Sequence, residues 1–303
     1  MRTTGRAGWA LTVLTVTLAG CGTGEAGSKA NADSSSALAV VASTDVWGDI
    51  VEQVGGSAVS VTSIISDPDQ DPHSYEANAS TSLALSKAAL VIENGGGYDD
   101  FVDQLLDANG SSATVLNAVD ISGKTAPVGG ELNEHVWYDF PTVERVADRL
   151  ADQLGELDPA NAHAFQTNAA AFKERVAELA SGEQALKRSH EGEGVAITEP
   201  VPLYLLEAAG LVNETPEDFS EAIEEGGEVS AATLKETLDL YSNHDVSVLV
   251  YNEQASGPIT DEVEQAAKEA GVPVVPVSET LPDGLHYVEW MKRNLDALKV
   301  ALD

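Results

Sequence analysis

Residues 157–190 read "LDPANAHAFQTNAAAFKERVAELASGEQALKRSH", and the organisation of the rest of the chain follows from this segment. Large apolar side chains recur in it every seven residues, at Phe165, Phe172, Leu179 and Leu186. That period is typical of one long helix with a single buried face. Asp158 suits the position before a helix and Pro159 suits its first turn. We therefore predict a helix over residues 159–190, with Gly182 as its weak point.

Short runs rich in β-branched residues lie on both sides of the predicted helix. Those before it are "ALAVVAST", "VSVTSII", "AALVIENG" and "ATVLNAV", and those after it are "GVAIT", "VSVLVYN" and "VPVVPVS". The runs alternate with helix-like segments, which is typical of parallel sheets in an α/β fold. We predict two α/β lobes, residues 38–158 and 191–303, each a parallel sheet flanked by helices, joined by the rigid helix.

The first residues have the features of an export signal. Two arginines precede the apolar run "AGWALTVLTVTLAG", which is too short to span a bilayer in a folded protein. The run ends in "LAGC" at Cys21, the single cysteine, and small residues before a cysteine are what a lipoprotein signal peptidase requires. We expect a signal peptide over residues 1–20, a lipid on Cys21 and a flexible tether over residues 21–37. The protein would then be anchored to the cell membrane outside the cytoplasm.

The chain is strongly acidic, because 50 Asp and Glu residues against 16 Lys and Arg give a formal charge of −34 over 303 residues. Such a surface repels nucleic acid and anionic lipid headgroups, which disfavours a DNA-binding or RNA-binding function. It attracts cations, although acids spread along the whole chain also serve solubility. We expect a monomer that binds no nucleic acid.

A stiffened loop presents one of the six histidines. In "SDPDQDPHSYEANAS", residues 66–80, Pro72 fixes its own φ and disfavours the helical region for Asp71. His73 is therefore held on a loop of limited freedom, directly after a predicted strand. A ligand or catalytic group is often held in this way.

Four potential metal ligands follow predicted strands: His73, His135, Glu199 and Glu279. Because open parallel sheets bind ligands beyond the carboxyl ends of their strands, we expect these side chains to gather in one cleft, with both histidines outside the hydrophobic cores. Two imidazoles and two carboxylates suit zinc, manganese, iron or nickel. Binding should then fade as the pH falls through about 6.5, where free imidazole gains a proton.

Each of the four residues also has a purely structural interpretation. His73 can simply follow the end of one element, and His135 can be a hydrogen-bonded histidine beside Trp137. Glu199 can cap the following helix, and Glu279 can be a surface acid. Their common position at strand ends favours the metal site.

Four segments are similar to motifs of one known family. "DPHSYE" and "EHVWYD" resemble its first and second ligand motifs, "TEPVPLYLLEAAGL" its third-ligand region, and "SETLPDGLHYVEWMKRNLDAL" its closing segment. From about Ala37 onward, the sequence resembles the solute-binding lipoproteins of zinc and manganese ABC importers, cluster A-I. The resemblance implies Zn²⁺ or Mn²⁺ carried as cargo between two lobes to a membrane permease. The ligands that it implies are His73, His135, Glu199 and Glu279.

The sequence departs from the family pattern in three places. Glu199 stands where the zinc branch usually has histidine and the manganese branch glutamate, which favours manganese. Glu279 replaces the usual aspartate, so it is the least secure ligand, and His286 is the reserve candidate. The segment "SGKTAPVGGELNEH" lacks the histidine-rich loop of many zinc-branch members, since its one histidine is His135. Zinc binds most such sites more tightly than manganese, so both metals stay open.

Two other functions stay open. A catalytic zinc usually keeps an open water position, often beside H-E-x-x-H, and the sequence has neither this motif nor an H-x-H pair. We therefore expect no enzyme, and an exported metallohydrolase is disfavoured. The resemblance also suggests an adhesin-type surface lipoprotein, but the sequence has no repeats or adhesive tract.

Overall fold

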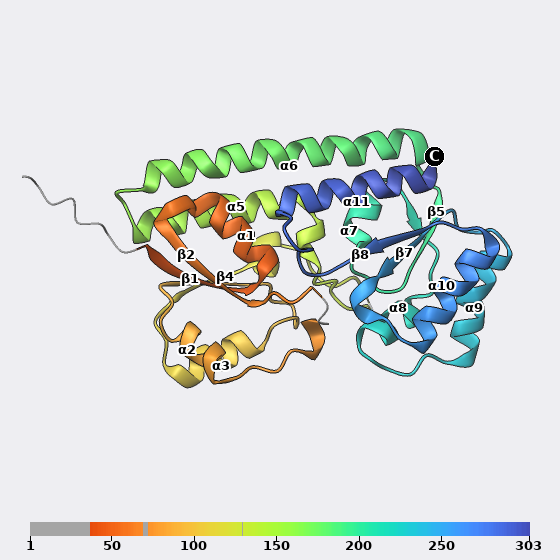
Figure 1. Cartoon of the computed structure of the whole chain (residues 1–303), viewed down its shortest axis with the longest axis horizontal. Helices are drawn as coiled ribbons and strands as arrows, with labels where there is room; N and C mark the ends of the chain where they lie inside the picture. Colours follow the sequence, from red (N-terminus) through yellow and green to blue (C-terminus); the bar gives the residue numbers. More distant parts are fainter. Residues whose placement is uncertain (1–36, 69–71, 129) are drawn as a thin grey trace, which may run out of the picture. The chain divides into compact units, whose positions relative to one another are not determined.

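The computed structural model describes residues 37–68, 72–128 and 130–303, which form two α/β halves (Figure 1). The first half holds a parallel sheet of order β2-β1-β3-β4. Its strands are β1 (Leu38–Thr44), β2 (Val59–Ile65), β3 (Leu90–Glu93) and β4 (Thr114–Asn117). The second sheet, also parallel, has the order β6-β5-β7-β8. Its strands are β5 (Gly194–Ile197), β6 (Val212–Asn213), β7 (Leu249–Asn252) and β8 (Val274–Val277).

Helices flank both sheets. Those of the first half are α1 (Asp45–Gly55), α2 (Ala79–Leu85), α3 (Phe101–Asn109), α4 (Ala118–Ser122) and α5 (Phe140–Leu157). Those that follow are α6 (Ala162–His190), α7 (Leu203–Ala208), α8 (Glu217–Glu224), α9 (Ala231–Ser242), α10 (Pro258–Ala270) and α11 (Tyr287–Leu302). The short 3₁₀ turns of the described residues are η1 (Gly56–Ala58), η2 (Pro72–Ser74), η3 (Val136–Tyr138) and η4 (Glu253–Ala255). The predicted class, two parallel α/β halves connected by a long helix, is confirmed.

The two sheets share one topology. In each sheet, the first strand in the sequence lies between the second and the third. The strand order therefore reverses at the first strand, and a crevice forms there at the carboxyl ends of the strands. The two-residue strand β6 was not predicted, because a strand of that length has no detectable alternation. Among the described residues, no helix is both long enough and apolar enough to span a membrane.

Helix α6 has the predicted single apolar face but begins later than predicted. Its buried residues are Phe165, Ala169, Phe172, Val176, Leu179, Glu183, Leu186 and His190. Asp158 caps the end of α5 instead of the start of α6, and its carboxylate accepts hydrogen bonds from the Ala160 backbone N–H at 3.2 Å and from Asn161 Nδ2 at 2.6 Å. These bonds stabilise the turn between the helices, so α6 starts at Ala162 rather than at residue 159.

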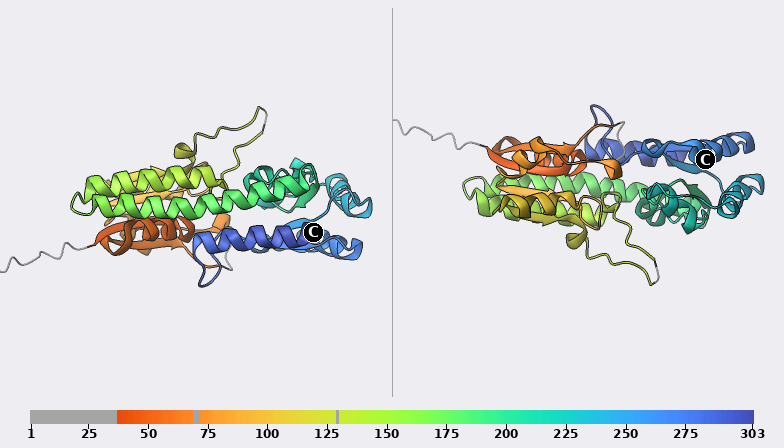
Figure 2. Two further views of the ribbon diagram at one scale, coloured as in Figure 1. Left: turned by 90° about the horizontal axis from the view of Figure 1, so that it is seen from above. Right: turned by 90° about the horizontal axis from the view of Figure 1, so that it is seen from below.

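Helix α6 connects the halves through one core. It packs against α1, α5 and α11, and runs beside α5 and α11 in two views (Figures 1 and 2). The largest cluster of buried apolar side chains includes Trp47 and Trp137 from the first half and Leu206 and Trp290 from the second. Gly182 does not interrupt the helix, and a Cβ there would lie 3.3 Å from Leu295 Cδ1, so the glycine allows α11 to approach closely.

One charged side chain interrupts the apolar face of α6. Glu183 is only 4% exposed, and its Oε1 has no hydrogen-bond partner among the described residues. Burial raises the pKa of Glu183 to about 8, and the charge of Asp139 acts in the same direction. The folded protein therefore retains a proton that the unfolded chain loses near its ordinary pKa of about 4.3, so stability falls as the pH rises between these two values.

We predict that Glu183→Gln removes this pH dependence. Its free energy of unfolding, relative to the wild type, should rise by about 1–3 kcal/mol between pH 5 and pH 8, since one pKa unit corresponds to about 1.4 kcal/mol. Urea unfolding of the metal-free proteins measures this difference. Glu178→Gln is the matched control, because Glu178 lies on the exposed face of the same helix. Equal pH profiles for the two variants would show that Glu183 titrates normally.

Candidate metal centre

The four residues singled out in the sequence all lie beyond carboxyl ends of strands. His73 is the middle residue of η2, after β2, and Tyr75 N–H donates to the Pro72 carbonyl at 3.1 Å to close that turn. His135 immediately precedes η3. Glu199 follows β5 and Glu279 follows β8, and both are buried. The first half thus supplies both imidazoles and the second half both carboxylates.

Three of these side chains meet at one point. Glu279 Oε2 lies 3.4 Å from His73 Nε2 and 3.6 Å from His135 Nε2. A carboxylate that we did not predict, Glu224 at the end of α8, joins them: its Oε1 lies 3.5 Å from His135 Nε2 and 3.9 Å from His73 Nε2. The ligand atoms of His73, His135 and Glu224 all lie within 4.8 Å of one another, which suits a shared metal ion.

Glu199 reaches this cluster through an amide. Asn252 ends β7 and is buried, and its Nδ2 donates both to Glu199 Oε2 and, at 2.9 Å, to Glu279 Oε1. Tyr98 OH donates to the other oxygen of Glu279 at 3.0 Å. The geometry therefore gives Glu279 a more central position than the sequence suggested, and it directs Glu199 toward Asn252.

His135 lies inside the core, which corrects the expectation that both histidines lie outside it. It has no exposed surface, and its ring packs edge to face against Trp137 with centroids 5.0 Å apart. Asn133 Oδ1 lies 2.8 Å from Nδ1 and also accepts the His135 backbone N–H. If Nδ1 carries the ring hydrogen, Nε2 has a free lone pair, and this atom has no hydrogen-bond partner among the described residues. A fully buried ring nitrogen with a free lone pair, close to two carboxylate oxygens, is suited to bind a metal cation.

The charges of the cluster are strongly coupled. Burial disfavours the charge of Glu279, yet the two imidazoles outweigh it and hold the pKa of Glu279 well below its usual range. Burial lowers the pKa of His73, but contact with Glu279 and the charge of Glu224 raise it to about 9. Burial raises the pKa of Glu199 to about 8, and the charge of Glu279 adds to that effect. The imidazolium of His73 thus balances the negative charge of Glu279 in the metal-free protein, as a bound metal cation would do in the complex.

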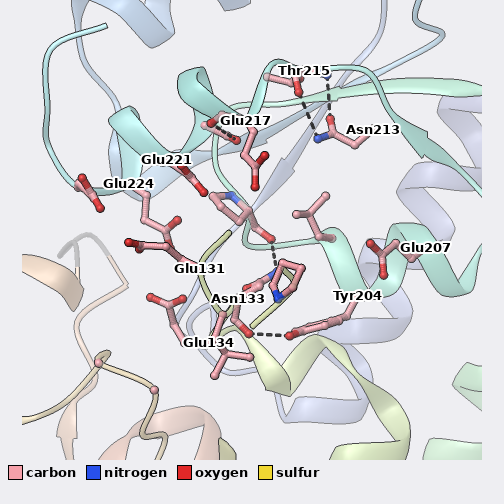
Figure 3. Close-up of a pocket in the computed structure, with 18 of the residues that line it drawn as sticks. Glu131, Asn133, Glu134, Tyr204, Glu207, Asn213, Thr215, Glu217, Glu221 and Glu224 are labelled. Carbon is pink, nitrogen blue, oxygen red and sulfur yellow. Dashed lines mark hydrogen bonds between the residues drawn. The ribbon is translucent and has the colours of Figure 1, made fainter. Parts of the chain in front are cut away.

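A cavity of about 960 Å³ lies beside the cluster, and carboxylates line it (Figure 3). Its acidic lining residues are Glu131, Glu134, Glu207, Glu217, Glu221, Glu224 and Glu225. Asn133 connects its two sides, because its Nδ2 donates to the Pro200 carbonyl at 3.0 Å and its own carbonyl accepts from Tyr204 OH at 2.6 Å. The cavity is therefore lined by residues of both halves and carries strong negative charge.

His286, the reserve candidate, has another partner. It precedes α11, its side chain is 61% exposed, and its Nδ1 lies 2.5 Å from Asp49 Oδ1. The second oxygen of Asp49 accepts the Tyr287 backbone N–H at 2.9 Å. His286 thus fixes the start of α11 against α1 and takes no part in the cluster.

Sequence reasoning missed Glu224 and Asn252 for different reasons. Asn252 ends the predicted strand "VSVLVYN", so the rule that identified Glu199 and Glu279 could also have found it. Glu224 lies in the acidic run "EAIEEGGE", where nothing separates it from Glu225. Only the tertiary structure shows that one of these neighbours reaches the histidines.

Known proteins show similarity along most of the chain. It is 28% identical to the manganese-binding lipoprotein MntA of Halalkalibacterium halodurans over 200 residues, which are 65% of each protein. It is 33% identical to MntA of Bacillus subtilis over 165 residues, 53% of this chain and 52% of that protein. The chain thus spans about two thirds and about half of these curated relatives.

The chain is also similar to a solved structure and to a family of sequences. The SBP FpvC from Pseudomonas aeruginosa in complex with Mn²⁺ has a TM-score of 0.73 and 25% identity, covering 88% of this chain and 98% of that one. The family described as "Zinc-uptake complex component A periplasmic" matches residues 40–301. Because this match includes almost every described residue, the chain belongs to that family.

Proposed function

We propose that this protein captures a divalent transition metal, Zn²⁺ or Mn²⁺, between its two halves and delivers it to the permease of an ABC importer. The observation that carries this proposal is the buried Nε2 of His135, which has no hydrogen-bond partner among the described residues. His73, Glu279 and Glu224 converge on that atom from both halves. Family membership and the manganese-binding relatives support the same function.

The ligands that we propose are His73, His135, Glu279 and Glu199. The histidines supply Nε2 atoms, and Glu279 supplies Oε2, which faces both. Glu199 lies next to Glu279 and can contribute an oxygen once it turns from Asn252. Two nitrogens with carboxylate oxygens suit both zinc and manganese, so the donor set supports either cargo.

The competing functions have less support. The family consists of uptake components, which supports the expectation that the protein is not an enzyme and disfavours a metallohydrolase. The formal charge of −34 continues to disfavour nucleic acid. Binding as a monomer to a membrane permease is part of the proposal, and the adhesin function has no described surface that favours it.

We predict that His135→Ala and His73→Ala each lower the affinity for Zn²⁺ and Mn²⁺ by more than about 100-fold. Loss of a side chain that only orients a metal ligand already costs about 10–100-fold in affinity, and these two residues themselves supply the metal-facing nitrogens. Competitive titration against a chelator measures the affinities. His286→Ala should bind as the wild type does, since His286 pairs with Asp49. Wild-type affinity in either of the first two variants, with an unchanged circular dichroism spectrum, would refute the site.

We predict that metal affinity declines as the pH falls below about 9, earlier than the value near 6.5 expected for a free imidazole. The raised pKa of His73 means that a metal must displace its proton at neutral pH. Because Glu199, another of the proposed ligands, also has a pKa raised to about 8, binding at pH 7 should release more than one proton, and the affinity should fall by at least about tenfold for each pH unit below 9. Calorimetry in buffers of different ionisation enthalpy counts the protons. No release at pH 7 would contradict the assignment.

We also propose that residues 1–20 are a signal peptide, that Cys21 is lipidated and that residues 21–37 tether the protein to the membrane. Cys21 and residues 1–36 lie outside the described residues. The motif "LAGC" and the relatives named lipoproteins support this proposal. We predict that Cys21→Ser abolishes labelling by a radioactive fatty acid and leaves the precursor uncleaved or releases the protein. Normal processing and membrane retention of Cys21→Ser would exclude the anchor.

A further inference from the structure

Glu224 lies at the end of a helix, unlike Glu199 and Glu279, which follow strands. It is the last residue of α8, and its side chain is only 12% exposed. Its Oε1 faces both imidazoles, at 3.5 Å from His135 Nε2 and 3.9 Å from His73 Nε2. The same oxygen has no hydrogen-bond partner among the described residues. Glu224 thus presents a free carboxylate oxygen to the point where the two nitrogens converge.

The other carboxylates of the second half are held differently. Glu279 receives hydrogen bonds on both oxygens, from Asn252 and from Tyr98. Glu199 directs its Oε2 to Asn252. Both are nearly inaccessible to solvent, with 2% and 3% of their surface exposed. Neither lines the large cavity, whereas Glu224 and His73 do.

This difference defines the side from which an ion reaches the cluster. Figure 3 shows Glu224, Glu131 and Glu134 along one side of the cavity, and all three line it. An ion that crosses the cavity therefore meets Glu224 and His73 before it meets His135 or Glu279.

We propose that Glu224 is a further metal ligand, which receives the ion from the cavity together with His73 and closes the coordination sphere on the solvent side. This inference rests on the proposed function of metal capture. It assigns Glu224 to the association step, and Glu199 and Glu279 to retention of the bound ion.

Stopped-flow association of Zn²⁺ with the full chain tests this role. Glu224→Gln keeps the shape of the side chain and removes its charge, and it should slow association at least about tenfold, on the scale of lost metal contacts. Glu225→Gln is the matched control, since Glu225 carries the same charge at the next position and is exposed. Glu224→His restores a ligand without the negative charge and should recover most of the rate.

Ionic strength separates coordination from long-range attraction. At about 1 M KCl the Debye length is about 3 Å, so steering by the acidic cavity is screened. The defect of Glu224→Gln should persist at this salt concentration, while any defect of Glu225→Gln should disappear. Equal rates for the two variants at high salt, or no recovery in Glu224→His, would overturn the inference. Absence of saturable Zn²⁺ binding by the wild type would instead refute metal capture itself, and this inference with it.

Discussion

The packing of α6 against both halves is the contact on which the metal centre depends. The ligands come from both halves, so they meet only if the two sheets are held at a fixed separation. Helix α6 packs on α1 and α5 of the first half and on α11, and the core beneath it is continuous across both. Tyr287 OH reinforces the connection by donating to the Trp137 carbonyl at 2.6 Å, two residues after His135. Packing therefore sets the size of the gap that the ligands surround.

The charge balance of the centre explains why this gap is polar. Burying carboxylates without partners is costly, and a structural core would contain apolar side chains there. Glu279 is instead held by Asn252 and Tyr98 on its two oxygens and faces two imidazoles. These donors orient the carboxylate before a metal arrives, which lowers the reorganisation that binding requires. A proton on His73 supplies the positive charge in the metal-free protein.

Local sequence patterns predicted the elements that have a periodic side-chain pattern and the ligands that directly follow strands. The heptad spacing of α6 and the β-branched runs depend on near neighbours in the chain, so sequence alone identified them. The start of α6 and the two-residue β6 were missed, because a turn stabilised by Asp158 and a very short strand have no periodic pattern. Glu224 was missed because its contact with His135 brings together two residues that are 89 positions apart in the sequence. That contact depends on how α8 lies over the crevice, which no local pattern specifies.

The position of Glu224 favours a role in metal binding rather than a role in stabilising the fold. A negative charge at the C-terminus of a helix is disfavoured by the helix dipole, by about 0.3–1 kcal/mol. Glu224 ends α8, and burial raises its pKa, with the charge of Glu134 as a smaller cause in the same direction. The nearby His135 acts in the opposite direction. A cation beside the two imidazoles would remove the remaining cost, so this carboxylate suits a protein whose charged ligands are matched by its cargo.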